Sequence, residues 1–167
     1  MVEEKSFGEK IQNIKYRDRV GAYGVILNEE NKVAVVKTKK GYFLLGGRVE
    51  NEETHEECIK RECSEEVGMD VVVKNFICKG GKYDYIDSIG YFYGIGYFYF
   101  AELIDIASKP KEKGHELLWV DIQDCCKYIH LEHQQWAVHI AINILNNKKY
   151  QGPNVNKLYF NSNKTNK

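Results

Sequence analysis

The chain of 167 residues has no net charge, because 24 lysines and arginines are balanced by 24 aspartates and glutamates. A surface for polymeric nucleic acid needs a basic excess, so this balance argues against such a partner. The chain also lacks a long apolar run, and its charged N-terminus, MVEEKSFGEK, has no apolar segment. We therefore expect neither a membrane span nor a secretory signal. A basic pocket for one phosphorylated small molecule remains open.

The cysteines are poorly placed for cross-linking. The five cysteines are an odd number, Cys125 and Cys126 are adjacent, and no CxxC pair is present. These features argue against a disulfide framework and against a structural zinc site. We expect the cysteines to be reduced, small hydrophobic residues in a cytoplasmic protein.

Strand and helix patterns alternate along the chain, which predicts a mixed α/β (α+β) layered domain over residues 1–150. The expected strands are 20–27, 33–38, 69–80, 91–103 and 117–122, with a short extended piece at 39–47, and the expected helices are 54–67 and 133–145. The first two strands flank the turn NEENK and should form a hairpin. Residues 1–16 should be a loose leader or a short edge element. Residues 151–167, rich in Asn and Lys, should be a mobile tail.

The helix at 54–67 has clear start and stop signals. Thr54 and Glu57 match a capping box, and Gly68 stands where a left-handed residue ends a helix. Its apolar stripe recurs every four residues and consists of Ile59, Cys63 and Val67.

Glu62, Glu65 and Glu66 lie within an arc of about 100° beside this stripe. Like charges one turn apart destabilise a helix, and its C-terminal half disfavours negative charge. A bound cation would compensate, and oxygen donors without His or Cys suit Mg²⁺, with Mn²⁺ as the alternative, rather than zinc. The preceding Gly46 and Gly47 would let the backbone approach a metal or a phosphate.

A solvated acidic face is the alternative interpretation. Glu56 can pair with Lys60, and Glu57 with Arg61, four residues further on. The three later glutamates have no basic residue four positions further on. Spacing alone therefore leaves both the metal site and the solvated face open.

The segment GGRVENEETHEECIKRECSEEVGM resembles the Nudix box, G-x5-E-x7-R-E-U-x-E-E-x-G-U, where U is an apolar residue. Every fixed position from Gly47 to Gly68 is filled. Two departures touch no ligand position: Cys63 stands where an aliphatic residue is usual, and Leu45 where a proline is common. The resemblance covers the box directly and the strand order from about 18 to 147 loosely.

This resemblance implies a Nudix fold, with a mixed sheet between helices, and hydrolysis of a nucleoside diphosphate linked to another moiety. The implied metal ligands are the Gly47 carbonyl, Glu62, Glu65 and Glu66. Glu53 and Arg61 would brace the loop and the helix by charge pairing. Family members often recruit one acidic residue from outside the box, and Glu116 matches such a place, with an exposed loop glutamate as the alternative. His115 is expected to be a surface histidine rather than a base.

The chemistry follows from charge. A pyrophosphate repels a water nucleophile, and Mg²⁺ neutralises that charge, orients the phosphoryl group and lowers the pKa of bound water. A carboxylate that the metal does not saturate can accept the proton. We expect Glu65 or Glu62 in that role, with Glu116 as the candidate from outside the box.

The substrate is less defined. YFYGIGYFYF sends tyrosines to one strand face and phenylalanines to the other, and core packing is favoured over base stacking for the tyrosine face. ADP-ribose hydrolases of the family tend to carry a proline some fifteen residues beyond the box, and KYDYID (82–87) has none. Diadenosine polyphosphate hydrolases tend to have a tyrosine there, and Tyr85 qualifies, although chance competes in a chain with 12 tyrosines. The proline-rich array of NADH-cleaving members is missing, and (oxidised) nucleoside triphosphates remain open.

Two rival classes are a non-catalytic Nudix-like module that binds a nucleotide for regulation, and a plain interaction domain. Intact box glutamates argue against the first, and the completeness of the motif argues against the second. The expected partner is a nucleotide-type small molecule, and a homodimer remains open because the sequence shows no interface.

Overall fold

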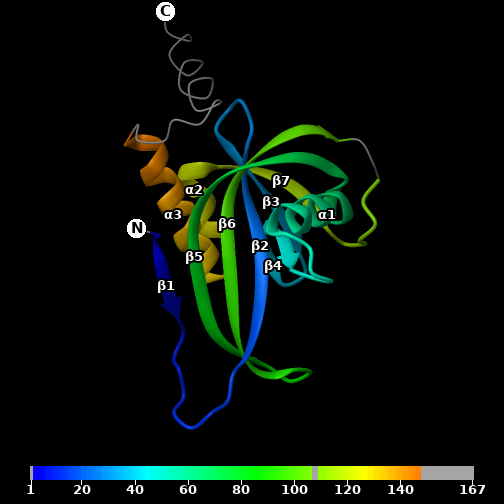
Figure 1. Cartoon of the computed structure of the whole chain (residues 1–167). Coiled ribbons are helices and arrows are strands. Elements are labelled where there is room, and N and C mark those ends of the chain that lie inside the picture. Colours follow the sequence, from blue (N-terminus) through cyan, green and yellow to red (C-terminus); the bar gives the residue numbers. More distant parts are fainter. Residues whose placement is uncertain (1, 107–108, 148–167) are drawn as a thin grey trace, which may run out of the picture.

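The computed structural model describes residues 2–106 and 109–147. One mixed seven-stranded sheet has helices on both faces (Figure 1), which confirms the expected fold class. The strands are β1 (Glu4–Phe7), β2 (Arg17–Leu27), β3 (Lys32–Thr38), β4 (Gly41–Arg48), β5 (Met69–Ile86), β6 (Gly90–Ile106) and β7 (Glu116–Asp121). The helices are α1 (His55–Val67), α2 (Ile122–Tyr128) and α3 (Glu132–Asn146). The strand order is β1-β5-β6-β2-β4-β3-β7, and the parallel pairs are β1–β5 and β2–β6.

Each face of the sheet carries its own hydrophobic core. Strand side chains alternate between faces, so β2 sends Ile26 under α1 and its neighbours Val25 and Leu27 under α2 and α3. The predicted apolar stripe of α1 is buried in the core between α1 and the sheet, where Ile59 and Cys63 are fully enclosed. The acidic residues beside this stripe are therefore held at the edge of a rigid layer.

The expected hairpin of 20–27 and 33–38 forms only at its turn. β2 and β3 pair at Leu27 and Val33, and then β4 lies between them. The reason is the tight turn between Thr38 and Gly41, which folds β4 back against β3. β4 parts from β2 at Leu44, whose N–H donates instead to Oε1 of Gln134 on α3 at 2.8 Å.

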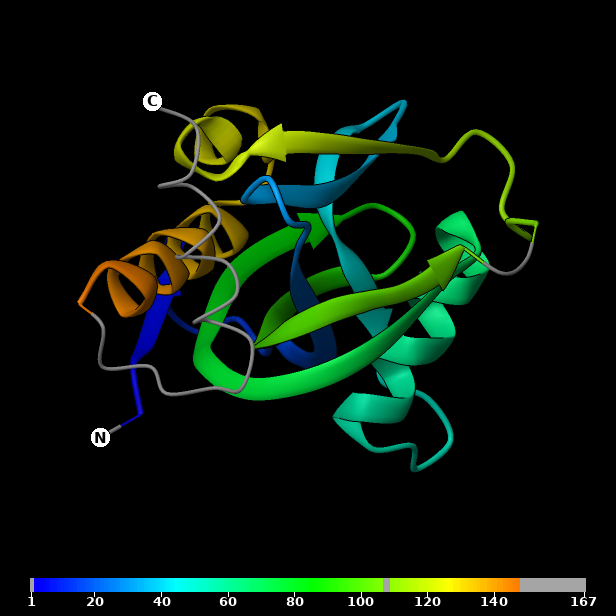
Figure 2. The same cartoon turned by 90° about the horizontal axis from the view of Figure 1, so that it is seen from above.

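β5 and β6 form a hairpin much longer than the expected 69–80 and 91–103. β5 bends at register shifts near Val71 and Phe76, and the curved hairpin is visible from above (Figure 2). β1 confirms the expected short edge element before residue 16. Among the described residues, none of the helices combines the length and apolar character needed to cross a membrane. The tail predicted at 151–167 lies outside the described residues.

Candidate active site

Helix α1 begins and ends where the sequence predicts. Oγ1 of Thr54 accepts from the N–H of Glu57 at 3.2 Å, and Glu57 returns a carboxylate to the N–H of Thr54 at 2.8 Å. Gly68 ends the helix in the left-handed conformation, with φ 69°. This capping fixes the C-terminal half of α1, which carries the acidic residues of the box.

Arg61 organises the carboxylates around it. Its Nε and Nη2 donate to the two oxygens of Glu53 at 3.0 and 2.7 Å. Its Nη1 donates to Glu62 at 2.8 Å and to Glu65 at 3.2 Å. The expected pair of Arg61 with Glu57 is not formed, because Glu57 caps the helix instead. These hydrogen bonds from Arg61 lower the pKa of Glu53 to about 2, so the brace implied by the family resemblance is charged on both sides.

Glu66 is buried, with 7% of its surface exposed. Its Oε2 accepts from the N–H of Gly46 at 3.4 Å, but burial still raises the pKa of Glu66 to about 8. Burial also raises the pKa of Glu62. The Glu62 carboxylate packs directly against Gly47, because a Cβ added at Gly47 would lie only 2.4 Å from Oε1 of Glu62. Two partly desolvated carboxylates beside a glycine backbone are an arrangement that a cation would stabilise.

A loop brings a further carboxylate to the helix. The N–H groups of Lys111 and Glu112 donate to the carbonyl oxygen of Glu65 at 2.9 and 3.1 Å. Two groups of three side chains result, and within each group the ligand atoms lie within 4.8 Å of one another. The first group is Glu62, Glu65 and Glu112, and the second is Glu66, Glu112 and His115. Sequence reasoning missed Glu112, because this contact joins residues far apart in the chain. The only signal was an acidic residue within the charged loop before β7.

Glu116, the expected residue from outside the box, lies elsewhere. It opens β7, and its carboxylate is 3.9 Å from Nζ of Lys37 on β3. His115, expected at the surface, has only 22% of its side chain exposed. Its Nδ1 atom lies 3.0 Å from a carboxylate oxygen of Glu112 and 3.9 Å from one of Glu66. The structure therefore gathers Glu112 and His115, and not Glu116, with the box glutamates.

The tyrosine face of β6 is divided between two environments. Near α1, the hydroxyl of Tyr99 lies 2.8 Å from Nδ1 of His55, and Tyr97 packs on the same imidazole with ring centroids 4.3 Å apart. Tyr85 is 51% exposed and pairs with Tyr91 near the tip of the β5–β6 hairpin. That tip is the end of β5 remote from α1, so Tyr85 is not brought to the acidic group.

The donor set fits a hard divalent cation. Its carboxylates suit Mg²⁺ or Mn²⁺, and its one imidazole is a donor that suits transition-metal ions. The nearby thiol of Cys58 lies against the backbone, with its Sγ 3.5 Å from the carbonyl oxygens of Gly47 and Arg48, and burial raises its pKa to about 12. All five cysteines are free, as expected. Gly47 lies against Glu62, and its carbonyl oxygen, which accepts from Sγ of Cys58 at 3.5 Å, stays a predicted ligand.

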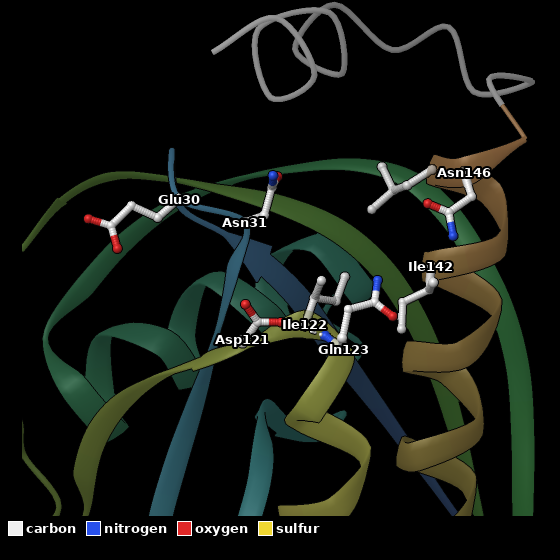
Figure 3. Close-up of a pocket in the computed structure, with 8 residues that line it drawn as sticks. Glu30, Asn31, Asp121, Ile122, Gln123, Ile142 and Asn146 are labelled. Atoms are coloured by element: carbon white, nitrogen blue, oxygen red, sulfur yellow. Dashed lines mark hydrogen bonds between the residues drawn. The ribbon is translucent and has the colours of Figure 1, made fainter. Parts of the chain in front are cut away.

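A pocket of about 260 Å³ lies away from this group, beside α2 and α3 (Figure 3). Its lining residues are Glu30, Asn31, Asp121, Ile122, Gln123, Ile142, Leu145 and Asn146. The two carboxylates already have partners: Glu30 pairs with Lys32 at 2.7 Å, and Asp121 accepts from the N–H of Gln123 at 2.9 Å. The pocket therefore offers no free charged group for catalysis.

Comparison with known proteins agrees with this geometry. The family described as the NUDIX domain matches residues 16–140. Among curated proteins, none matches the chain by sequence. A MutT Nudix hydrolase from Burkholderia pseudomallei shares 22% identity with a TM-score of 0.60, over 74% of this chain and 97% of that one. A MutT protein from Methanosarcina mazei shares 16% with a TM-score of 0.62, over 78% and 98%.

An ADP-ribose pyrophosphatase from Streptococcus suis shares 15% identity with a TM-score of 0.57, over 80% of this chain and 94% of that one. At these identities, likeness to solved structures establishes the fold, whereas the domain match over most of the chain establishes the family. The chain therefore belongs to the Nudix family and is a hydrolase that acts on phosphoanhydride bonds.

Proposed function

We propose that the chain is a Mg²⁺-dependent pyrophosphohydrolase that cleaves a nucleoside diphosphate linked to another moiety by attack of water on phosphorus. The observation that carries this proposal is the convergence of Glu62, Glu65 and Glu66 with Glu112 beside the Gly46–Gly47 backbone. Mg²⁺ or Mn²⁺, when bound, would neutralise the phosphates and acidify a water molecule. The family is typically metal-dependent, which agrees with this donor set.

The box residues divide into ligands and supports. Glu62, Glu65, Glu66 and the Gly47 carbonyl would hold the cation, and Arg61 with Glu53 keeps the first two carboxylates turned toward it. A carboxylate oxygen that is free of the cation would take the proton of the attacking water. Glu62 and Glu65 are our candidates from the box. We propose Glu112, in place of the expected Glu116, as the acidic residue from outside the box, because its carboxylate is grouped with those of Glu62 and Glu65.

The substrate class is a nucleotide with a phosphoanhydride, and nucleoside triphosphates or dinucleoside polyphosphates fit it. The solved relatives include proteins described as MutT and as ADP-ribose pyrophosphatase. The lack of a proline in 82–87 still disfavours ADP-ribose. Tyr85 stays a predicted substrate contact. Because it lies near the tip of the β5–β6 hairpin, remote from α1, only a long substrate could reach both Tyr85 and the acidic group. The free cysteines fit a cytoplasmic location.

Phosphate or pyrophosphate release from a nucleotide panel with Mg²⁺ tests the proposal. Glu62→Gln and Glu66→Gln should each lower kcat by at least about 10²-fold while the protein stays folded. Glu56→Gln is the matched control, because Glu56 lies on an exposed face of the same helix and pairs with Lys60. Near-wild-type turnover of either site variant in saturating Mg²⁺ would contradict the assignment.

The same panel tests the rival class. A non-catalytic nucleotide-binding module would bind a nucleotide without releasing phosphate at any Mg²⁺ concentration. The complete set of box glutamates argues against this alternative, because a non-catalytic module could lose these residues without losing its role.

A further inference from the structure

His115 stands at the edge of the acidic group, outside the Nudix box and directly before β7. Its side chain is 22% exposed. Its Nδ1 atom is nevertheless closed to solvent, and within the described part of the chain no group forms a hydrogen bond with it. The nearest charged atoms are Oε2 of Glu112 at 3.0 Å and Oε1 of Glu66 at 3.9 Å. A buried polar atom without a hydrogen bond needs an explanation, and coordination to a metal ion would supply one.

Surface ion pairs of the same chain look different. Lys60 with Glu56, and Lys127 with Asp124, are exposed on both sides and form hydrogen bonds. Such pairs contribute little to stability and leave their polar atoms in contact with water. The imidazole of His115 is instead enclosed by carboxylates without being aligned to either, so it is not an ordinary surface pair.

The loop that carries His115 is anchored on α1. Hydrogen bonds from Lys111 and Glu112 to the carbonyl of Glu65 tie the loop to the helix that bears the acidic residues. Gly114 then turns the chain with φ 81°, and a Cβ there would meet nothing within 4 Å. Glycine is therefore required by the backbone turn rather than by crowding. The turn directs His115 onto the acidic group.

We propose that Nδ1 of His115 is a metal ligand. Together with Glu66 and Glu112 it would make a mixed nitrogen and oxygen position that favours a first-row transition-metal ion over Mg²⁺. This inference rests on the proposed function, because it concerns metal choice at the same site.

The reason is the chemistry of the donors. One ligand atom from each of Glu66, Glu112 and His115 lies within 4.8 Å of the other two. Mg²⁺ prefers oxygen ligands, whereas imidazole nitrogen suits transition metals, whose affinities rise along the Irving–Williams order. The neighbouring group of Glu62, Glu65 and Glu112 contains carboxylates alone and suits Mg²⁺. Glu112 is common to both groups, so the site offers two adjacent positions with different preferences.

Mn²⁺ is a suitable probe, because it is paramagnetic and binds both donor types. Metal-free full-length protein would be titrated with Mn²⁺, with and without excess Mg²⁺, and examined by pulsed electron paramagnetic resonance. We expect coupling to a directly bound imidazole nitrogen in the wild type and its loss in His115→Gln. The preference for Mn²⁺ over Mg²⁺ should fall about tenfold in that variant.

His139→Gln is the matched control, since His139 is exposed on α3, on the other face of the sheet from α1. It should keep both the nitrogen coupling and the metal preference. Labelling the wild type with ¹⁵N-histidine gives the same test without a substitution, because the coupling must change to the ¹⁵N pattern.

Two results would overturn the inference: tight Mn²⁺ binding without nitrogen coupling in the wild type, or coupling that survives His115→Gln. Either result leaves the proposed hydrolase standing. Failure of the proposed function looks different, because the metal-loaded wild type would then release no phosphate from any nucleotide, whatever its spectrum shows.

Discussion

Arg61 shows at the residue scale how one side chain sets the geometry of several carboxylates. Its planar guanidinium binds both oxygens of Glu53 and contacts Glu62 and Glu65 with its remaining nitrogen. Lysine carries the same charge, but its ammonium group is a compact point charge that cannot reproduce the planar, two-pronged hydrogen-bonding fork of a guanidinium. The position therefore tests whether geometry, beyond charge, matters for the site.

We predict that Arg61→Lys lowers kcat at least about tenfold in saturating Mg²⁺, because the ligands lose their fixed orientation. The same change should lower the free energy of unfolding by about 1–3 kcal/mol, since the partly buried Glu53 loses a charged hydrogen-bond pair. Urea denaturation and steady-state kinetics measure the two effects. Lys60→Gln serves as control, because its pair with Glu56 is exposed. Unchanged kinetics in Arg61→Lys would show that the fork is not needed.

At the scale of elements, the close approach of β4 to β2 depends on the glycine at position 46. Gly46 has φ 137°, and a Cβ there would lie 2.2 Å from the carbonyl oxygen of Ala22 on β2. Its N–H also donates to Glu66. The glycine is therefore required both by its backbone conformation and by the close approach of the neighbouring strand.

Gly46→Ala should therefore destabilise the fold by about 3 kcal/mol or more, because strain and a backbone clash add together. Gly94→Ala on β6 is the control, since its Cβ would meet only ordinary van der Waals contacts at 3.5 Å or beyond. Urea midpoints at unchanged m-value give the comparison. Equal stability of the two variants would show that the β2–β4 approach can relax.

Local signals and long-range contacts explain which elements could be predicted. The ends of α1 follow from Thr54 and Gly68, which act on the nearest backbone groups, and the sequence therefore predicts them well. Strand pairing is not local. The alternation of apolar and polar residues along each strand does not reveal that β4 lies between β2 and β3. The same limit applies to Glu112, because its place depends on a loop that folds back onto Glu65.

At the scale of the whole molecule, the core under α3 encloses a histidine. His133 packs against Phe98 of β6 with ring centroids 5.9 Å apart. Burial, and then the charge of Lys82, lower its pKa to about 4, and Asp84 opposes this only partly. An unfolded histidine titrates near pH 6.5. Between about pH 4 and 6.5 the unfolded chain therefore binds a proton that the folded chain does not.

Stability should be complete above about pH 6.5 with respect to this group and fall as pH drops toward about 4, by up to about 3 kcal/mol. Urea unfolding of metal-free protein across this range would show it. His133→Gln should reduce the slope, whereas His139→Gln, which alters an exposed position on the same helix, should keep it. A stability difference between His133→Gln and wild type that does not vary with pH would refute the linkage.

The proposed activity of the whole molecule depends on a cation held between α1 and the loop that follows β6. Anomalous scattering from crystals grown with Mn²⁺ locates such an ion without relying on turnover. We predict a strong peak among the carboxylates of Glu62, Glu65, Glu66 and Glu112, absent in Glu62→Gln/Glu66→Gln. No peak there at saturating Mn²⁺, or a peak only at another surface, would contradict the central claim.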